Sequence, residues 1–462
     1  MQLTEFIEKM PEYQQLATQL APKTRQLVTG ITGSARALLI QTLLHAQGKP
    51  MIFVTDTMYH ADQLVAELSS SLTDDELFEF PVEELLAAEI ATSSPDFLAQ
   101  RILAMSALRA DKPVVVVTSV AGLRRQLPLP QSFDTAHFTL KTGDDIDSED
   151  VIAHLQRMGY HRQKLVDAPG DFAVRGSIID IYPLDTEYPV RVDLFDTEID
   201  SLRYFDASTQ RSVENIDEVT ILAVTDLLLN PEQRNAAAKR LTDALKTQMK
   251  QLDDDGAEQL SNFVTPLVDD LKKGGVSAEL RLFGDYLFGD VSLLDYLADD
   301  GLVLLDDYPR VREANKQLEL DEANWAVDKL KDHQIFTDQQ FGLPFANVLK
   351  KDQHAEIFFA LFQKGMGNMR FSQLIEIQTR SMQQFFGQMP LLKQEIERWQ
   401  SLNQTVVLLI NDEERLNKVS ETLDDFKIKT VMTKPVICNP ARSSWHLDSS
   451  KTGLNYPRPS WL

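Results

Sequence analysis

Residues 27–39 (LVTGITGSARALL) have the order of a phosphate-binding loop, in which an apolar strand is followed by a glycine turn and a helix. Counted from Gly30 against G-x-x-x-x-G-K-[ST], the positions that contact a nucleoside triphosphate and its magnesium are Ala35, Arg36 and Ala37. Ala35 places a Cβ where the backbone must approach phosphates, and Arg36 presents a planar fork instead of a compact ammonium. Ala37 has no oxygen for a metal. The degenerate nucleotide loop consists of Gly30, Gly33, Ser34, Ala35, Arg36 and Ala37.

Two acidic residues, Asp306 and Asp307, end the apolar run GLVLLDD at the point where a hydrolase holds magnesium. Paired acids at strand ends are also common solvated features, so they are a weak signal of catalysis. We therefore predict no catalytic residues and no cofactor for this chain, and a strand–turn–helix that is retained because it packs well. The alternative is an active P-loop ATPase, which the missing lysine and hydroxyl disfavour.

A second group of residues points to partner binding. In the strand VRVDLF (190–195) the aliphatic residues alternate toward the core, which leaves Arg191 and Phe195 on the polar face. The same alternation in the preceding hairpin turns Arg175 outward. Basic residues outnumber acidic ones between positions 157 and 175, and arginines beside an exposed aromatic are typical of binding hot spots. A scattered exposed phenylalanine among solvated arginines is the competing interpretation.

The composition limits the remaining possibilities. A formal net charge of −24 disfavours nucleic-acid binding over a broad surface, which requires a basic stripe. The single cysteine, Cys438, excludes an internal disulfide, and the eight histidines lack the spacing of a zinc site, so we expect no metal. No signal peptide or apolar stretch of membrane-spanning length is visible. We expect a soluble cytoplasmic protein.

The order of elements predicts an α/β protein. Apolar strands at 25–29, 51–55 and 113–119 alternate with amphipathic helices, as in a parallel-sheet, P-loop-like domain of the RecA or helicase type. A helix capped by Ser148 and closely spaced hairpin strands then indicate an inserted α+β domain. The strand at 301–307 should return to the first sheet. The predicted divisions are 1–137, 138–222 (inserted), 223–345 (completing the first domain), 346–435 (a small α/β domain with a strand at 405–410) and an irregular tail, 436–462.

The sequence as a whole resembles a known family. GDFAVRGSIIDIYPLDTEYPVRVDLFDTEIDSLRYFDASTQRSVENIDEVTI (170–221), GITGSARALL (30–39) and IFVTDTMYHADQL (52–64) resemble the UvrB-homology region of bacterial transcription-repair coupling factors (Mfd). QQFFGQMPLLKQEIERW (383–399) resembles the small domain that follows it. UvrB itself has a working loop of the form GxTGxGKT, so the resemblance implies a UvrB-derived copy whose loop has decayed.

The resemblance implies an adaptor for transcription-coupled nucleotide excision repair. Such a protein recruits UvrA to RNA polymerase stalled at DNA damage, and the UvrA contacts carried over to this sequence are Arg175, Arg191 and Phe195. ATP and magnesium belong to a separate DNA translocase module of the family. We expect that module, and the domains that contact RNA polymerase and DNA, to be absent from this chain. A UvrB-like ATPase or helicase subunit is the alternative, and a passive acidic scaffold is a third.

Overall fold

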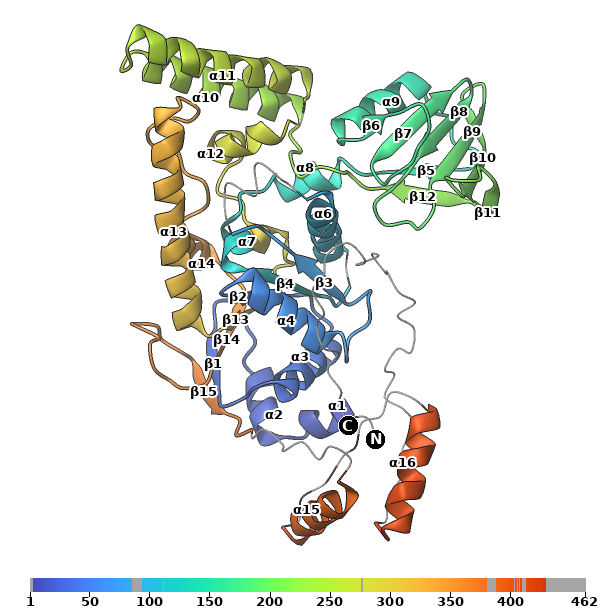
Figure 1. The fold of residues 1–462 in the computed structure, drawn as a ribbon, viewed down its shortest axis with the longest axis vertical. Coiled ribbons are helices and arrows are strands. Elements are labelled where there is room, and N and C mark those ends of the chain that lie inside the picture. Colours follow the sequence, from blue (N-terminus) through green and yellow to red (C-terminus); the bar gives the residue numbers. More distant parts are fainter. Residues whose placement is uncertain are drawn as a thin grey trace.

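The computed structural model describes residues 3–84, 94–110, 112–275, 277–379, 388–402 and 413–428, together with residues 404, 406 and 408. Figure 1 shows a central sheet flanked by helices, with a helical unit at one end and a β-rich unit beside it. The predicted tail and the core of the predicted strand at 405–410 lie outside the described residues.

The central sheet has seven strands, all parallel, in the order β15-β1-β14-β13-β2-β4-β3. The strands are β1 (Arg25–Thr29), β2 (Met51–Thr55), β3 (Leu77–Phe80), β4 (Val115–Ser119), β13 (Leu302–Asp306), β14 (Ala355–Ala360) and β15 (Gln373–Glu376). Most of them are continuous apolar runs, because helices cover both faces of the sheet. The predicted α/β class is confirmed, and so is the return of the 301–307 strand to the first sheet.

Helices bury the two faces of this sheet in separate clusters. One cluster, which contains Leu16, Ile40 and Leu64, is formed by α2 (Pro11–Ala17), α3 (Ser34–Gln47) and α4 (Met58–Leu68), with α1 (Leu3–Glu8) against α3. The opposite cluster contains Ile102, Leu123 and Val311. Its helices are α6 (Pro95–Arg109), α7 (Val120–Arg124), α8 (Pro130–Asp134), α13 (Tyr308–Lys331) and α14 (Phe345–Lys351).

The predicted boundary at residue 346 falls inside the sheet. Strand β14 lies between β1 and β13, and β15 forms the edge beyond β1. Both strands follow residue 346, so the central sheet continues to Glu376. The sequence analysis did not single out the apolar run AEIFFA of β14, and the position of a strand in a sheet depends on pairing with distant segments.

The inserted unit begins and ends on one antiparallel pair, β5 (Phe138–Lys141) with β12 (Glu218–Ile221). This pairing brings the entry and exit of the unit side by side, as an insertion requires. A second sheet has the order β11-β10-β9-β8-β7-β6 and is antiparallel except for β6 with β7. Its strands are β6 (His161–Arg162), β7 (Asp171–Arg175), β8 (Ile178–Ile181), β9 (Val190–Phe195), β10 (Glu198–Phe205) and β11 (Ser212–Ile216).

Helix α9 (Ser148–Arg157) covers the inner face of the second sheet through Val151 and Leu155. The predicted cap at Ser148 is wrong by one residue. The carboxylate of Asp147 accepts hydrogen bonds from the backbone N–H groups of Glu149 and Asp150. A carboxylate at this position also interacts favourably with the helix dipole.

The helical unit consists of α10 (Pro231–Met249) and α11 (Asp254–Lys273), which pack on the short elements η1 (Ala278–Phe283) and α12 (Gly284–Leu287). The element η2 (Leu293–Tyr296) leads back to β13. Near the end of the chain, α15 (Met389–Ser401) and α16 (Glu413–Asp425) bury Ile396 and Leu423 in one small cluster. None of the helices in the described part of the chain has the length and apolar character of a membrane span.

A buried carboxylate joins these parts. Asp226 is 2% exposed and accepts hydrogen bonds from Arg101 of α6 (3.3 Å) and from Arg125 (3.0 Å). Arg281 of η1 forms an ion pair with the same carboxylate. Burial alone would raise the pKa of Asp226, but the attraction of Arg281, Arg125 and Arg101 holds this pKa below its usual range. We call these four residues the Asp226 cluster.

Asp226→Asn should lower the free energy of unfolding by about 3–5 kcal/mol, because guanidinium groups would remain buried without their carboxylate. Urea unfolding followed by circular dichroism measures the change. The control is Asp269→Asn, which removes an exposed carboxylate 3.6 Å from Lys272 and should cost less than about 0.5 kcal/mol. Equal stability of the two variants would contradict a structural role for the Asp226 cluster.

Candidate functional site

Two of the three predicted partner-binding residues meet at a carboxylate that the sequence analysis did not single out. Asp180 of β8 is 1% exposed and accepts a hydrogen bond from Arg175 of β7 at 2.5 Å. Arg191 of β9 binds the same carboxylate through Nε at 2.6 Å and through a terminal nitrogen at 2.9 Å. The strand register explains the contact with Arg191, because Asp180 and Arg191 are directly paired and therefore share a face.

Phe195 is the most exposed of the three, with 77% of its surface accessible. It is the last residue of β9, and Arg175 is the last residue of β7. Both strands are antiparallel to β8, which lies between them, so their final residues lie at the same end of the sheet. Together, Arg175, Asp180, Arg191 and Phe195 form what we call the Asp180 face.

Arg191 is less accessible than strand alternation predicts. Its side chain is 11% exposed, and its guanidinium lies 4.1 Å from the ring centroid of Phe205. Phe205 is itself fully buried in a small cluster with Ala173 and Val166, so the outer face of the sheet is partly covered. Hydrogen bonding to Asp180 raises the pKa of Arg191. Alternation identified the correct face of the strand, but it carries no information about what lies on that face.

A second ion pair lies next to Arg191 on the neighbouring strand. Arg203 of β10, directly opposite Arg191, contacts the carboxylate of Asp193 at 2.5 Å. Arg175 is the more accessible of the two arginines on Asp180, with 40% of its side chain exposed. The sequence analysis overlooked Asp180, the one acidic residue in the strand IIDI (178–181). An acid among apolar residues that is paired with an arginine on the next strand predicts a cross-strand ion pair.

The degenerate nucleotide loop has the expected backbone path. Gly30 and Gly33 have φ angles of 79° and 56°, and α3 begins at Ser34. The segment that follows β15 lies against the loop, where Thr379 donates a hydrogen bond to the Gly30 carbonyl at 2.8 Å and accepts one from the Thr32 N–H at 3.2 Å. A Cβ on Gly30 would come within 2.9 Å of the carbonyl oxygen of Ile377, so glycine is needed there for packing.

The structure brings the loop and the acidic strand end together as an ion pair. Arg36 binds Asp306 at 2.7 Å, and its side chain is only 16% exposed. A second contact joins Arg36 to Glu67 at 3.4 Å. The guanidinium therefore uses the carboxylate that would hold magnesium, and Ala37 supplies no oxygen in its place. These residues do not fit a magnesium nucleotide.

Asp307 does not take part in this contact. It has a left-handed backbone (φ 45°), precedes α13, and lies 3.9 Å from Arg310. Burial raises the pKa of its carboxyl group. Within the described ranges, no three His, Cys, Asp or Glu side chains are grouped as a metal site would require.

Comparison with known proteins relates the chain to one group. Residues 138–227, which contain the Asp180 face, match the family model of the UvrB interaction domain. The chain is 32% identical over 431 residues to the transcription-repair-coupling factor of Bacillus subtilis, covering 93% of this chain and 37% of the relative. The factor of Staphylococcus haemolyticus is 29% identical, covering 88% of the chain and 35% of the relative. The chain thus spans little more than a third of the length of the curated relatives it matches.

The nucleotide loop generates a prediction about ATP. The chain should show no magnesium-dependent ATP turnover above background, because Arg36 is paired with Asp306 and Ala37 cannot bind the metal. The triple change Ala35→Gly, Arg36→Lys and Ala37→Thr should restore nucleotide binding, since the start of α3 still supplies backbone donors. A fluorescent nucleotide titration and a phosphate-release assay measure the two properties. Turnover by the unmodified chain that is lost in Asp306→Asn would contradict this interpretation.

Proposed function

We propose that the chain, which is similar to the transcription-repair-coupling factor of Bacillus subtilis along 93% of its length, serves as an adaptor in transcription-coupled DNA repair. In this role residues 138–227 recruit UvrA to RNA polymerase stalled at DNA damage. The observation that carries the proposal is the Asp180 face, where an exposed phenylalanine lies at the same end of a rigid sheet as a fixed arginine. The match of this segment to the UvrB interaction domain supports the proposal.

The three proposed contact residues have different roles. Phe195 is the anchor, because burying an exposed aromatic side chain releases a large apolar surface from water. Arg175 is the directional contact, since 40% of its side chain remains accessible while Asp180 fixes its orientation. Arg191, at 11% exposure, acts mainly by holding Asp180 in place. Contacts that are fixed before binding lose less conformational entropy when the partner arrives.

The degenerate nucleotide loop supports an adaptor over an ATPase. An ion pair between Arg36 and Asp306 stabilises the loop without a ligand. In this proposal, ATP-driven DNA translocation and the contacts with RNA polymerase and DNA belong to other parts of the longer proteins. No cofactor is required for the role proposed here.

Phe195→Ala and Arg175→Ala should each weaken UvrA binding by about tenfold or more, as expected for hot-spot truncations of ~2 kcal/mol. Neither side chain is in the core, so both variants should fold normally. Isothermal titration of purified UvrA measures the affinities, with circular dichroism as the folding check. The matched control is Val213→Ala, which removes a 52% exposed apolar side chain on β11 of the same sheet. Equal affinity of all variants would refute the site, and no binding by the unmodified chain would refute the adaptor role.

Asp180→Asn tests whether the buried carboxylate positions the contact residues. Asp180 is 1% exposed, so it has almost no surface to offer a partner. Weaker hydrogen bonds should nevertheless release Arg175 and lower the affinity for UvrA several-fold at a temperature where the variant is folded. Asp193→Asn, which breaks the neighbouring pair with Arg203, is the control and should have the smaller effect. Unchanged affinity of folded Asp180→Asn would show that the carboxylate only stabilises the sheet.

A further inference from the structure

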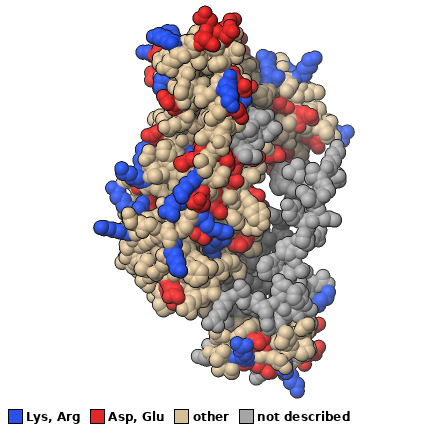
Figure 2. Space-filling view, turned by 60° about the vertical axis from the view of Figure 1, so that its left-hand side comes forward, with Lys and Arg blue, Asp and Glu red and all other residues tan. Residues whose placement is uncertain are grey.

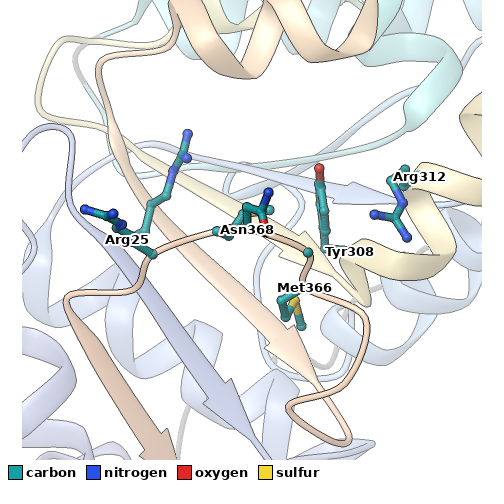
Figure 3. A pocket seen from close by; sticks show the side chains of 8 residues that line it. Arg25, Tyr308, Arg312, Met366 and Asn368 are labelled. Atoms are coloured by element: carbon teal, nitrogen blue, oxygen red, sulfur yellow. The ribbon is translucent and has the colours of Figure 1, made fainter.

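A second group of arginines lines a cavity on the central domain, away from the inserted unit. The cavity has a volume of about 440 Å³ and lies between β1, the start of α13 and the loop that joins β14 to β15 (Figure 3). Its lining consists of Arg25, Tyr308, Arg312, Met366, Gly367, Asn368, Met369 and Arg370. No acidic residue belongs to this lining. We call it the arginine cavity.

The loop that forms one wall is exposed along most of its length and is anchored at Met366 and at its end. Met366 is 6% exposed, and the flanking Gly365 and Gly367 have φ angles of 83° and 61°. A Cβ on Gly365 would lie 2.8 Å from the ring of Pro309, so the loop approaches α13 as closely as glycine allows. The loop ends where Ser372 donates hydrogen bonds to the Arg25 carbonyl from its N–H (2.7 Å) and its hydroxyl (2.8 Å).

The opposite wall is also fixed. The ring of Tyr308 stacks on Phe345 with centroids 6.2 Å apart and meets Phe358 edge-on at 5.7 Å. In Figure 3 the side chain of Tyr308 stands between Asn368 and Arg312. The cavity is therefore formed before any ligand arrives, as ligand sites usually are.

The arginines of the cavity are not all neutralised. Arg25 forms a bidentate pair with Glu356 at 2.7 and 3.1 Å. Arg312 has a buried Nε without a hydrogen-bond partner, and within the described residues neither Arg312 nor Arg370 has an acidic group within 4.0 Å. Figure 2, with the side of α13 turned forward, shows Lys and Arg side chains gathered among Asp and Glu over the middle of this face.

Two uncompensated guanidinium groups are unexpected in a chain with a net charge of −24. Arg312 is half-buried and Arg370 is exposed, whereas other arginines of the described part that are withdrawn from solvent, such as Arg36 and Arg124, bind carboxylates. A guanidinium that has no carboxylate partner keeps its positive charge available to an anionic ligand. Charge and donor geometry then define the ligand, because guanidinium forks match the oxygens of phosphate and carboxylate.

We propose that the arginine cavity binds a dianionic phosphate group. Two unpaired guanidinium groups balance a phosphate monoester, which carries close to two negative charges at pH 7, better than the single charge of a carboxylate. The side chains of Asn368 and Tyr308 add neutral donors beside the arginines. Met366, Met369 and the ring of Tyr308 supply an apolar wall for the organic part of a phosphate ester. The volume lies within the ~300–1,000 Å³ of small-molecule sites.

Titration of the whole chain with inorganic phosphate, pyrophosphate and acetate at low ionic strength tests the proposal, with calorimetry and phosphorus NMR as readouts. Phosphate should bind, and acetate should bind at least about tenfold more weakly. Arg312→Gln and Arg370→Gln should each raise the Kd for phosphate about tenfold or more, because each removes a charge-assisted hydrogen bond. Asn368→Asp, on the exposed loop, should abolish binding by placing a carboxylate in the cavity.

The matched control is Arg310→Gln, two residues before Arg312 on α13 and outside the cavity lining, which should leave the Kd unchanged. A short single-stranded oligonucleotide with or without a 5′-phosphate separates the possible sources of the group. Tighter binding of the phosphorylated strand than of inorganic phosphate would assign the site to a nucleic-acid end, and weaker binding would assign it to a free phosphate ester. Equal binding of phosphate and acetate, or equal Kd values of Arg310→Gln and Arg312→Gln for phosphate, would overturn the proposal.

Discussion

The carboxylate of Asp226 is the point at which separate parts of the chain are tied together. Arg101 and Arg125 come from the parallel-sheet domain, Arg281 comes from the helical unit, and Asp226 itself lies just after the inserted unit. An inserted unit has two connections to its host, and a charged cluster at the exit fixes the direction in which the chain leaves. Removing charges from water is unfavourable, so such a cluster persists only because every member has a partner. The relative placement of the three parts therefore depends on one buried anion.

Arginine–carboxylate pairs occur at two further positions. They differ in how much of the arginine side chain remains exposed. At the Asp180 face, a buried carboxylate holds one arginine that is 40% exposed and can still meet a partner. In the nucleotide loop, Arg36 is 16% exposed and its guanidinium is paired with the carboxylate of Asp306. The three carboxylate–arginine pairs therefore differ in how much of the arginine remains accessible to a partner: almost none of Arg101, little of Arg36 and 40% of the side chain of Arg175.

Local patterns predicted the parts of the fold that local forces determine. Continuous apolar runs identified β1, β2, β4 and β13 because both faces of a parallel sheet are buried. Alternation placed Phe195 on the outer face, where it is 77% exposed. It failed for Arg191, since the burial of that side chain depends on Phe205 from another strand. The Asp226 cluster and the position of β14 in the sheet depend on residues far apart in the sequence. The hydrophobic periodicity of a single segment gives no information about such contacts.

The two proposed sites differ in how their arginines are used. On the Asp180 face the carboxylate cancels much of the positive charge, so recognition there relies on the shape of Phe195 and on directed hydrogen bonds from Arg175. In the arginine cavity Arg312 and Arg370 have no such carboxylate, so the attraction is mainly electrostatic and weakens as salt is added. A chain with a net charge of −24 repels anions at long range, and a phosphate group must therefore gain its binding energy inside the cavity. This favours a small, precisely fitted anion over a long polyanion lying across the surface.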